Sequence, residues 1–136
     1  MSDKTTLLSD QDIFAATQNC IDAWNTLDLE TTLATYTDDV VYNDPACRGR
    51  IHGKDDLRRY LRKFMQKWDM QFRVLEDRRI EGANAQVCLW EADIRLRDSD
   101  GPTITQAGMD IIHVRDGQLS RDEAFMDRLP MTQQFS

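Results

Sequence analysis

The residue run with the clearest capacity for chemistry is Asn43-Asp44-Pro45, which follows the short β-prone segment Val40–Tyr42. Pro45 cannot donate to a sheet and favours an extended Asp44, so this carboxyl group should stand at a strand end. If aromatic and aliphatic side chains exclude water there, its pKa should rise, and it could move a proton next to a carbonyl group. The structural alternative is a turn, because Asp before Pro commonly bonds to nearby backbone.

A second acid, Asp110, lies between Met109 and the pair Ile111-Ile112. A charge is costly in such apolar surroundings unless it is paired, so we expect Asp110 to line a pocket. Asp122 and Glu123 add two acids to another apolar segment. Alternation along a strand predicts that only one of these two points inward.

The two histidines are weaker candidates. His113 titrates near neutral pH and could partner an acid, but strand alternation puts it on the face opposite Asp110 and therefore outward. His52 lies beside Gly53 in a loop that could line the mouth of a pocket. Because these histidines are isolated and no Cys pair occurs, we expect no metal site. No Gly-rich phosphate loop or dinucleotide fingerprint is present, so we expect no cofactor.

Aromatic residues could form the walls of a site for a flat hydrophobic ligand. The periodicity predicts a core position for Trp68 and leaves both roles open for Trp24 and Trp90. Tyr42 or Tyr60 could contribute a hydroxyl group, although the helical spacing favours a core position for Tyr60. The substrate-binding set that we predict is Trp24, Tyr42, His52, Trp90 and Asp122.

Composition narrows the class of protein. The 136 residues carry a net charge of −7 and are 40% hydrophobic, which indicates one acidic globular domain. This charge opposes nucleic-acid binding, and the cluster of Lys and Arg at 54–67 falls on the polar side of a predicted helix. No apolar run approaches the length of a membrane span and no signal peptide is evident, so we expect a cytoplasmic protein that does not bind membranes. The three cysteines should be reduced thiols.

The elements that must position these residues follow from hydrophobic periodicity. A helix is predicted over about 10–27, a short helix from Asp28 to near Asp38, and a regular helix over about 57–68. Four strands at about 70–81, 85–97, 103–115 and 118–126 are separated by turn residues. Three helices before an antiparallel meander predict an α+β fold with the helices on the concave face of a bent sheet. We expect a single domain, 1–136, in which 1–9 are flexible.

Several motifs resemble those of one known superfamily. They are Ala23-Trp24-Asn25 with Asp28-Leu29-Glu30, the run from Tyr36 to Pro45, Gly53-Lys54-Asp55-Asp56-Leu57, and Asp116-Gly117-Gln118-Leu119. Together they resemble the nuclear-transport-factor-2-like superfamily, in its ketosteroid isomerase and SnoaL-type polyketide cyclase group. The resemblance implies a cone-shaped α+β barrel, with a bent and mainly antiparallel sheet on three N-terminal helices, and an apolar cavity. It also implies a homodimer formed through the convex side of the sheet.

The resemblance also implies residue roles. Asp44 stands where ketosteroid isomerases carry their general base, and Asp110 stands where they hold a protonated acid that donates to the oxyanion. Cys20 falls where those enzymes place a tyrosine, and a thiol is a weak donor, which puts steroid isomerisation in doubt. The implied activity is cofactor-independent acid–base catalysis on a hydrophobic carbonyl compound, of the isomerase or cyclase type.

Two alternatives remain open at this point. One is a module that binds a hydrophobic small molecule, or pairs through its sheet, without chemistry. The other is epoxide hydrolysis, for which members of this superfamily use an Asp-Arg-Asp set. Asp93 and Arg95 offer two of those residue types, but alternation puts both on the predicted solvent face.

Overall fold

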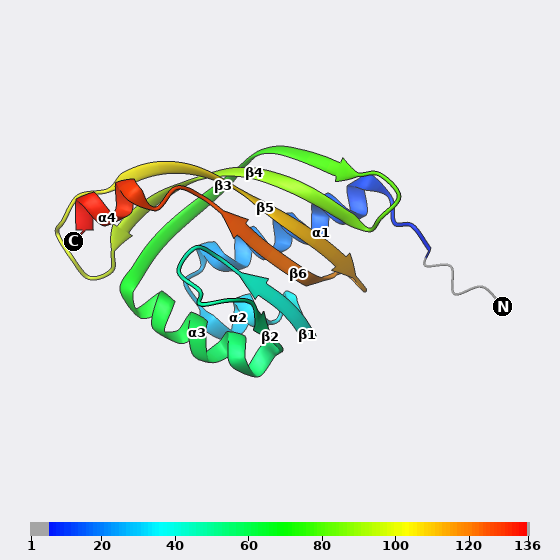
Figure 1. Ribbon diagram of the computed structural model, residues 1–136, viewed down its shortest axis with the longest axis horizontal. Helices are drawn as coiled ribbons and strands as arrows, with labels where there is room; N and C mark the ends of the chain where they lie inside the picture. The colour runs from blue at the N-terminus through cyan, green and yellow to red at the C-terminus, as the bar shows by residue number, and fades with distance from the viewer. Residues whose placement is uncertain (1–5, 136) are drawn as a thin grey trace.

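The computed structural model describes residues 6–135, which form helices packed on one six-stranded sheet (Figure 1). The elements are α1 (Asp10–Asn25), α2 (Leu29–Leu33), β1 (Tyr36–Asn43), β2 (Ile51–His52), α3 (Lys54–Lys67), β3 (Trp68–Ile80), β4 (Ala85–Leu96), β5 (Ile104–Arg115), β6 (Gln118–Phe125) and α4 (Leu129–Phe135). The strand order is β2-β1-β6-β5-β4-β3. This arrangement confirms the predicted α+β class.

The sheet is mixed. β3, β4, β5 and β6 pair antiparallel in sequence order, as the turn residues predicted, whereas β1 joins β6 in parallel and pairs antiparallel with β2. Irregular registers leave Leu75 of β3 and Ser120 of β6 without a partner in the neighbouring strand. Such bulges bend long strands, and Figure 1 shows β3, β4 and β5 curving over α1.

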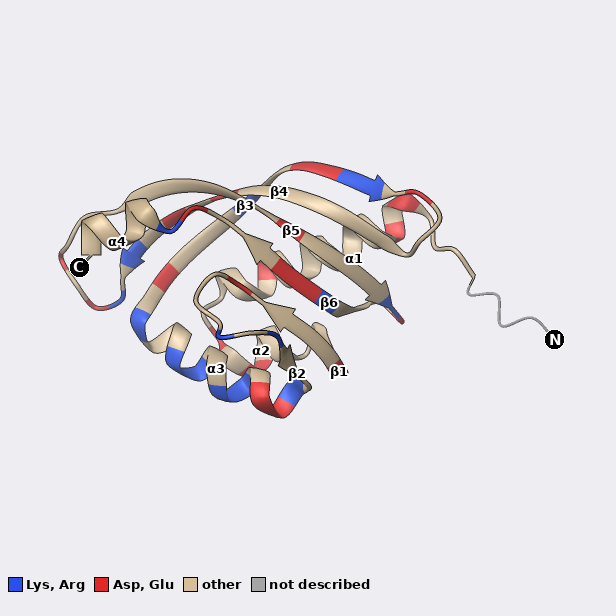
Figure 2. Ribbon diagram, in the orientation of Figure 1, with Lys and Arg blue, Asp and Glu red and all other residues tan. Residues whose placement is uncertain are grey.

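Two helices cover the concave face, and each buries one side. Ser9 caps α1 by accepting a hydrogen bond from the Asp12 amide, and the inward side of α1 includes Ile13, Cys20 and Trp24. The inward side of α3 consists of Leu57, Leu61 and Met65. Lys and Arg recur on the outer side of α3 (Figure 2), which is the solvated face that its sequence predicted.

The second helix is shorter than predicted. It ends at Leu33, and the residues from Tyr36 onward form β1 instead of continuing the helix towards Asp38. Leu29, Leu33 and Tyr36 have helical spacing, but Tyr36 is fully buried within the sheet and its backbone pairs with Leu119 of β6. Partners distant in sequence therefore override the local pattern.

Two further elements were not predicted. β2 has only two residues, and α4 has seven, with Pro130 in its first turn. A helix this short depends on packing against the rest of the fold. Met131 is buried, and Phe135 packs edge-on against Trp68 at a centroid distance of 5.2 Å.

The N-terminal segment is tied to the β3–β4 turn. The Leu8 amide donates to Asn84 Oδ1 at 2.7 Å, and Asn84 Nδ2 donates to the Thr6 carbonyl at 3.0 Å. Residues 1–5 make up most of the segment predicted to be flexible, and they lie outside the described residues. Residues 6–8 are held in place by these bonds.

Candidate functional site

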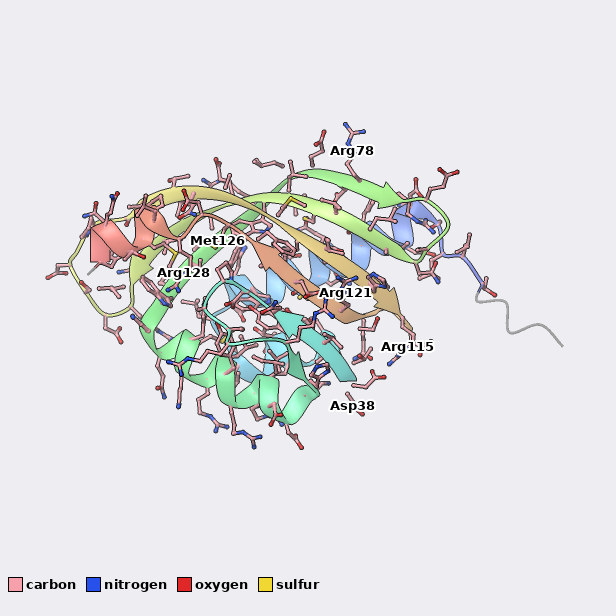
Figure 3. All side chains as sticks on the ribbon, viewed as in Figure 1. Asp38, Arg78, Arg115, Arg121, Met126 and Arg128 are labelled. Atoms are coloured by element: carbon pink, nitrogen blue, oxygen red, sulfur yellow. The ribbon has the colours of Figure 1, made fainter. Side chains whose placement is uncertain are left out.

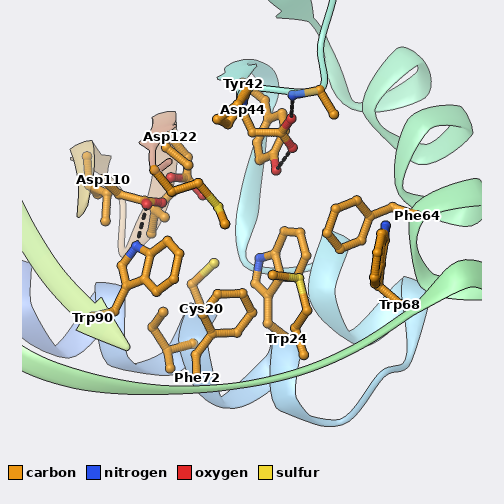
Figure 4. A pocket seen from close by; sticks show the side chains of 18 of the residues that line it. Cys20, Trp24, Tyr42, Asp44, Phe64, Trp68, Phe72, Trp90, Asp110 and Asp122 are labelled. Carbon is orange, nitrogen blue, oxygen red and sulfur yellow. Dashed lines mark hydrogen bonds between the residues drawn. The ribbon is translucent and has the colours of Figure 1, made fainter. Parts of the chain in front are cut away.

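An apolar cavity lies between α1, α3 and the concave face of the sheet. The space open to the centre of a water molecule is about 90 Å³, several times the roughly 10–15 Å³ that one water needs. Most of the lining is aliphatic or aromatic, with carboxyl groups from three strands or strand ends (Figure 4). The lining residues are Thr17, Cys20, Ile21, Trp24, Tyr42, Asp44, Pro45, Ala46, Phe64, Trp68, Met70, Phe72, Trp90, Asp110, Ile112, Leu119, Asp122, Ala124, Met126, Arg128 and Met131.

Asp44 stands just after β1, as predicted, and its carboxylate is surrounded by donors. The Tyr42 hydroxyl donates to Oδ2 at 2.8 Å, and the Tyr60 hydroxyl lies 2.8 Å from Oδ1 and 2.7 Å from Oδ2. The Ala46 amide donates to Oδ1 at 2.8 Å, and the Cys47 thiol lies 3.5 Å from the same oxygen. Asp44 therefore combines the expected turn with a place on the cavity wall.

The two tyrosines at Asp44 keep their protons. Burial and the negative charge of Asp44 raise the pKa of Tyr42 and of Tyr60 above the usual value. Tyr60 was predicted to be a core residue because of its helical spacing. Its ring does pack in the helix–sheet interface, at 5.8 Å from the Tyr42 ring, but its hydroxyl belongs to the Asp44 cluster.

Asp110 lines the cavity from β5, as predicted, and accepts a hydrogen bond from Trp90 Nε1 at 2.7 Å. Trp90 lies on the neighbouring strand directly opposite Gly108. A side chain at 108 would collide with the indole, because an added Cβ would stand 2.6 Å from its Cη2 atom. Gly108 therefore lets the Trp90 ring lie flat across β5 and reach Asp110.

Asp122 is the most deeply buried acid of the cavity. Its residue is 4% exposed, and the Tyr36 hydroxyl donates to Oδ2 at 2.6 Å while accepting from Trp24 Nε1 at 2.9 Å. Burial raises the pKa of Asp122 well above its usual value, and the neighbouring Asp110 carboxyl group raises it further. The Tyr36 hydroxyl opposes this rise.

The carboxyl groups of Asp110 and Asp122 form a pair on adjacent strands (Figure 4). Oδ1 of Asp122 is buried and has no hydrogen-bond partner among the described residues. The raised pKa of Asp122 favours its neutral, protonated form. A buried carboxylic acid therefore lies beside a second carboxyl group in an apolar cavity.

Cys20 lines the cavity between these groups and is buried. Burial, assisted by the charge of Asp122, raises the pKa of its thiol to about 12. The thiol is therefore neutral, as expected for a small buried residue. Beside it on α1, Thr17 Oγ1 is buried and has no hydrogen-bond partner among the described residues.

The predicted site residues fall into two groups. The cavity lining includes most of them, namely Asp44, Asp110, Trp24, Tyr42, Trp90 and Asp122, and it also includes Trp68. His52 does not, because it is exposed on the edge strand β2 beside the start of α3. His113 points to the other face of the sheet and lies 3.2 Å from Arg121.

Glu123 and Asp93 also lie away from the cavity. Glu123 is buried on the outer face of the sheet, where it forms ion pairs with Arg50 and Arg121. Burial raises the pKa of Glu123, but the two guanidinium groups outweigh burial and lower it. Asp93 pairs with Arg73, and Arg95 pairs with Asp69. The prediction that Asp93 and Arg95 lie outside is confirmed, so they cannot supply an Asp-Arg-Asp set to the cavity.

Metal-binding and membrane-spanning features were sought within residues 6–135. No three His, Cys, Asp or Glu side chains in this range are grouped so that they could hold a metal ion. None of the helices in this range combines the length and the apolar character required to cross a membrane.

Comparison with solved structures shows how widely this fold recurs. A provisionally named isomerase from Bacillus subtilis is 16% identical, with a TM-score of 0.83 over 94% of this chain and 96% of that chain. A provisionally named polyketide cyclase from Xanthomonas campestris pv. campestris is 20% identical, with a TM-score of 0.78 over 94% and 100%. An LEH-like epoxide hydrolase from M. tuberculosis is 17% identical, with a TM-score of 0.73 over 91% and 89%. At such identities the likeness shows the fold alone.

Comparison of sequences gives the family. A search of curated protein sequences found no match. A family model, however, matches residues 17–121, which run from the cavity side of α1 into β6 and include Asp44 and Asp110. The chain therefore belongs to the SnoaL-like domain family of the nuclear-transport-factor-2-like superfamily.

Proposed function

We propose that this protein is a cofactor-independent enzyme that moves a proton on a hydrophobic, carbonyl-containing substrate, in an isomerisation or a cyclisation. The observation that carries the proposal is the placing of Asp110 and Asp122 side by side in an apolar cavity, where burial raises the pKa of Asp122. A carboxylic acid kept protonated near neutral pH can donate to a carbonyl oxygen as negative charge develops on it. Proteins of similar structure have been named as isomerases, cyclases and epoxide hydrolases, which is consistent with this class.

Asp44 is the base in this proposal. The Tyr60 hydroxyl touches both of its carboxylate oxygens, but a hydroxyl group has one proton to donate. One acceptor position of the carboxylate is therefore only partly used and can receive the substrate's α-proton. The Asp110–Asp122 pair would hold the carbonyl oxygen while Asp44 takes the proton, and reprotonation at another carbon completes an isomerisation.

The buried and unpartnered hydroxyl of Thr17 gives further support. Buried polar groups are nearly always hydrogen-bonded, but Thr17, a residue of the cavity lining, has a buried Oγ1 atom without a partner among the described residues. A polar group of a bound molecule would satisfy it. A cavity with this lining is therefore suited to a ligand that is mainly apolar and has a few polar atoms.

The test does not require the natural substrate. The protein is incubated in D2O with a panel of hydrophobic ketones, and deuterium entering the position next to the carbonyl is followed by mass spectrometry. We expect exchange to be accelerated and to fall by about 10²–10⁴-fold in Asp44→Asn and Asp122→Asn, the range for a lost acid or base. Asp22→Asn, on the exposed side of α1, is the matched control and should exchange as the wild type does.

The competing function is ligand binding without chemistry. It is favoured by Cys20, a neutral and weak donor at the position where the resemblance places a tyrosine. Ketones that bind the cavity but gain no deuterium would establish this alternative. Equal exchange in the wild type and in both carboxyl variants would overturn the assignment of Asp44 and Asp122.

A further inference from the structure

Arg128 is the single Lys, Arg or His among the described residues that line the cavity. It belongs to the segment that leaves β6 and begins α4, and its residue is exposed. A residue that lines the cavity and is also open to solvent stands at the mouth. Figure 3 shows Arg128 next to Met126 on the side of the molecule where α4 lies.

The guanidinium group of Arg128 is not used within the fold. Among residues 6–135 it forms no ion pair and no side-chain hydrogen bond. The adjacent carboxylate, Asp127, is engaged elsewhere because its Oδ1 accepts from the Leu129 amide at 2.9 Å. Arg62 and Lys63 on α3 likewise form no ion pair within the described part of the chain, so what distinguishes Arg128 is its place in the cavity lining.

The backbone around Arg128 is held firmly. The Asp127 carbonyl accepts from Gln106 Nε2, and the Arg128 carbonyl accepts from the Thr132 amide at 2.9 Å. Met126 and Met131 on either side line the cavity, and Met131 is 5% exposed. The backbone that carries the guanidinium group is therefore fixed beside an apolar wall.

The parallel pairing of β1 and β6 sets where Arg128 lies relative to the acids. Asn43 pairs with Glu123, so Asp44 and the segment 124–128 leave the sheet at the same end. The Asp110–Asp122 pair lies further along the strands, towards the centre of the sheet. A ligand that enters from this end meets Arg128 at the mouth and the carboxyl pair further inside.

From this arrangement we infer that the substrate is a hydrophobic carbonyl compound with a carboxylate at the end that remains at the mouth, where Arg128 binds it. A guanidinium group binds a carboxylate through two parallel hydrogen bonds, which a neutral group cannot match. The apolar body lies against the methionines and tryptophans, and the carbonyl reaches the inner pair. The inference rests on the proposed function for the carbonyl, but the carboxylate contact can be tested by itself.

The experiment compares two ligands that differ only in charge, 4-phenylbutanoate and 4-phenylbutanamide. Trp24, Trp68 and Trp90 line the cavity, so binding is followed by tryptophan fluorescence. We expect the wild type to bind the carboxylate about three- to tenfold more tightly than the amide, as befits a partly exposed charge pair. Arg128→Gln should reduce this ratio to about one without changing the affinity for the amide.

Two further variants separate charge from shape. Arg128→Lys keeps a positive charge and should keep part of the preference for the carboxylate. Arg62 is an exposed cation on α3 and does not line the cavity. Arg62→Gln should therefore leave the ratio unchanged. Added salt should lower the ratio wherever a cation remains at position 128, and should leave the ratio of Arg128→Gln unchanged, because salt screens an exposed pair.

Three outcomes would overturn the inference: no binding of either ligand, an unchanged ratio in Arg128→Gln, or an equal loss of affinity for both ligands. The last outcome would make Arg128 part of the apolar wall and nothing more. Failure of the proposed function is recognised separately. If Arg128 determines the preference for the carboxylate but no ketone gains deuterium, the anion site stands and the catalytic assignment falls.

Discussion

The Tyr36 hydroxyl donates a 2.6 Å hydrogen bond to Oδ2 of Asp122, although 86 residues separate them in the sequence. Tyr36 in turn accepts from Trp24 of α1, so the bond joins α1, β1 and β6 behind the cavity. Tyr36 is the one hydrogen-bonding group that lowers the pKa of Asp122 against burial and the charge of Asp110. It therefore positions the acid of the pair and limits how strongly its pKa is raised.

Tyr36→Phe should destabilise the fold and remove the hydrogen bond that lowers the pKa of Asp122. Removing the hydroxyl leaves Trp24 Nε1 and Asp122 Oδ2 without their partner, which should lower the free energy of unfolding by about 1–3 kcal/mol. The pKa of Asp122 should rise further. Urea denaturation measures the first effect, and NMR titration of the carboxyl carbon measures the second. An unchanged Asp122 titration would show that the tyrosine acts on stability alone.

Asp122→Asn should change how stability depends on pH. The folded-state pKa of Asp122 is raised above its usual value of 3.8, so folding retains a proton that the unfolded chain releases. The stability from Asp122 is therefore complete below that value and is lost as pH rises through the folded-state pKa. The asparagine does not ionise, so this decline should disappear.

The expected size of this effect follows from linkage. From about pH 4 to pH 8 the stability of the Asp122→Asn variant should rise relative to the wild type by about 1.4 kcal/mol for each unit of pKa shift that it removes. Urea denaturation from about pH 4 to pH 8 measures the difference, and Asp22→Asn provides the control, since it should follow the wild type. A stability difference between variant and wild type that stays constant from about pH 4 to pH 8 would show that the pKa of Asp122 is not raised in the folded protein.

Gly108→Ala should displace Trp90. The added Cβ would stand 2.6 Å from Cη2 of the indole and closer still to Cζ2, so the ring must move and lose its bond to Asp110. Overpacking of this kind costs about 1–3 kcal/mol. Gly101→Ala is the control, because its nearest neighbour is the flexible Ser99 side chain. Thermal denaturation and tryptophan fluorescence should both change in the first variant only.

The sequence was sufficient to predict most of the fold, because its elements have clear periodicity. The alternation of Trp90, Ala92 and Ile94 with polar residues correctly placed β4 with one face inward. Prediction failed where a contact between distant segments decides the outcome. The strand at Tyr36 depends on β6, and α4 depends on Trp68 and the cavity wall.

The cavity could be predicted only in part, for the same reason. Asp44 and Asp110 were identified from their neighbours in the sequence, whereas the pairing of Asp110 with Asp122 depends on the register between β5 and β6. The Tyr60 hydroxyl was considered, but helical spacing favoured a core position for that residue. Arg128 was not singled out, because no motif marks it. His52 was placed at the mouth from its loop position, but β2 carries it to the edge of the sheet.

The outer face of the sheet carries an apolar row that no described element covers. Leu89, Met109 and Phe125 are paired across three strands, and Phe125 is 50% exposed. Each of these residues neighbours a cavity-lining residue in its strand, so strand alternation directs them away from the cavity. Val87 and Ile111 extend this row on the same face.

We propose that this row packs against the same row of a second copy of the chain, because one apolar patch related by a two-fold axis is self-complementary. Phe125→Asp would bury two unpaired charges at the centre of the contact and should turn a dimer into a monomer. Leu7→Asp is the control, since Leu7 is 54% exposed but lies before α1. Sedimentation equilibrium measures the mass of each. Either of two results would show that the outer face is not a dimer interface. One is a wild type that is monomeric at micromolar concentration, and the other is a Phe125→Asp variant that remains dimeric.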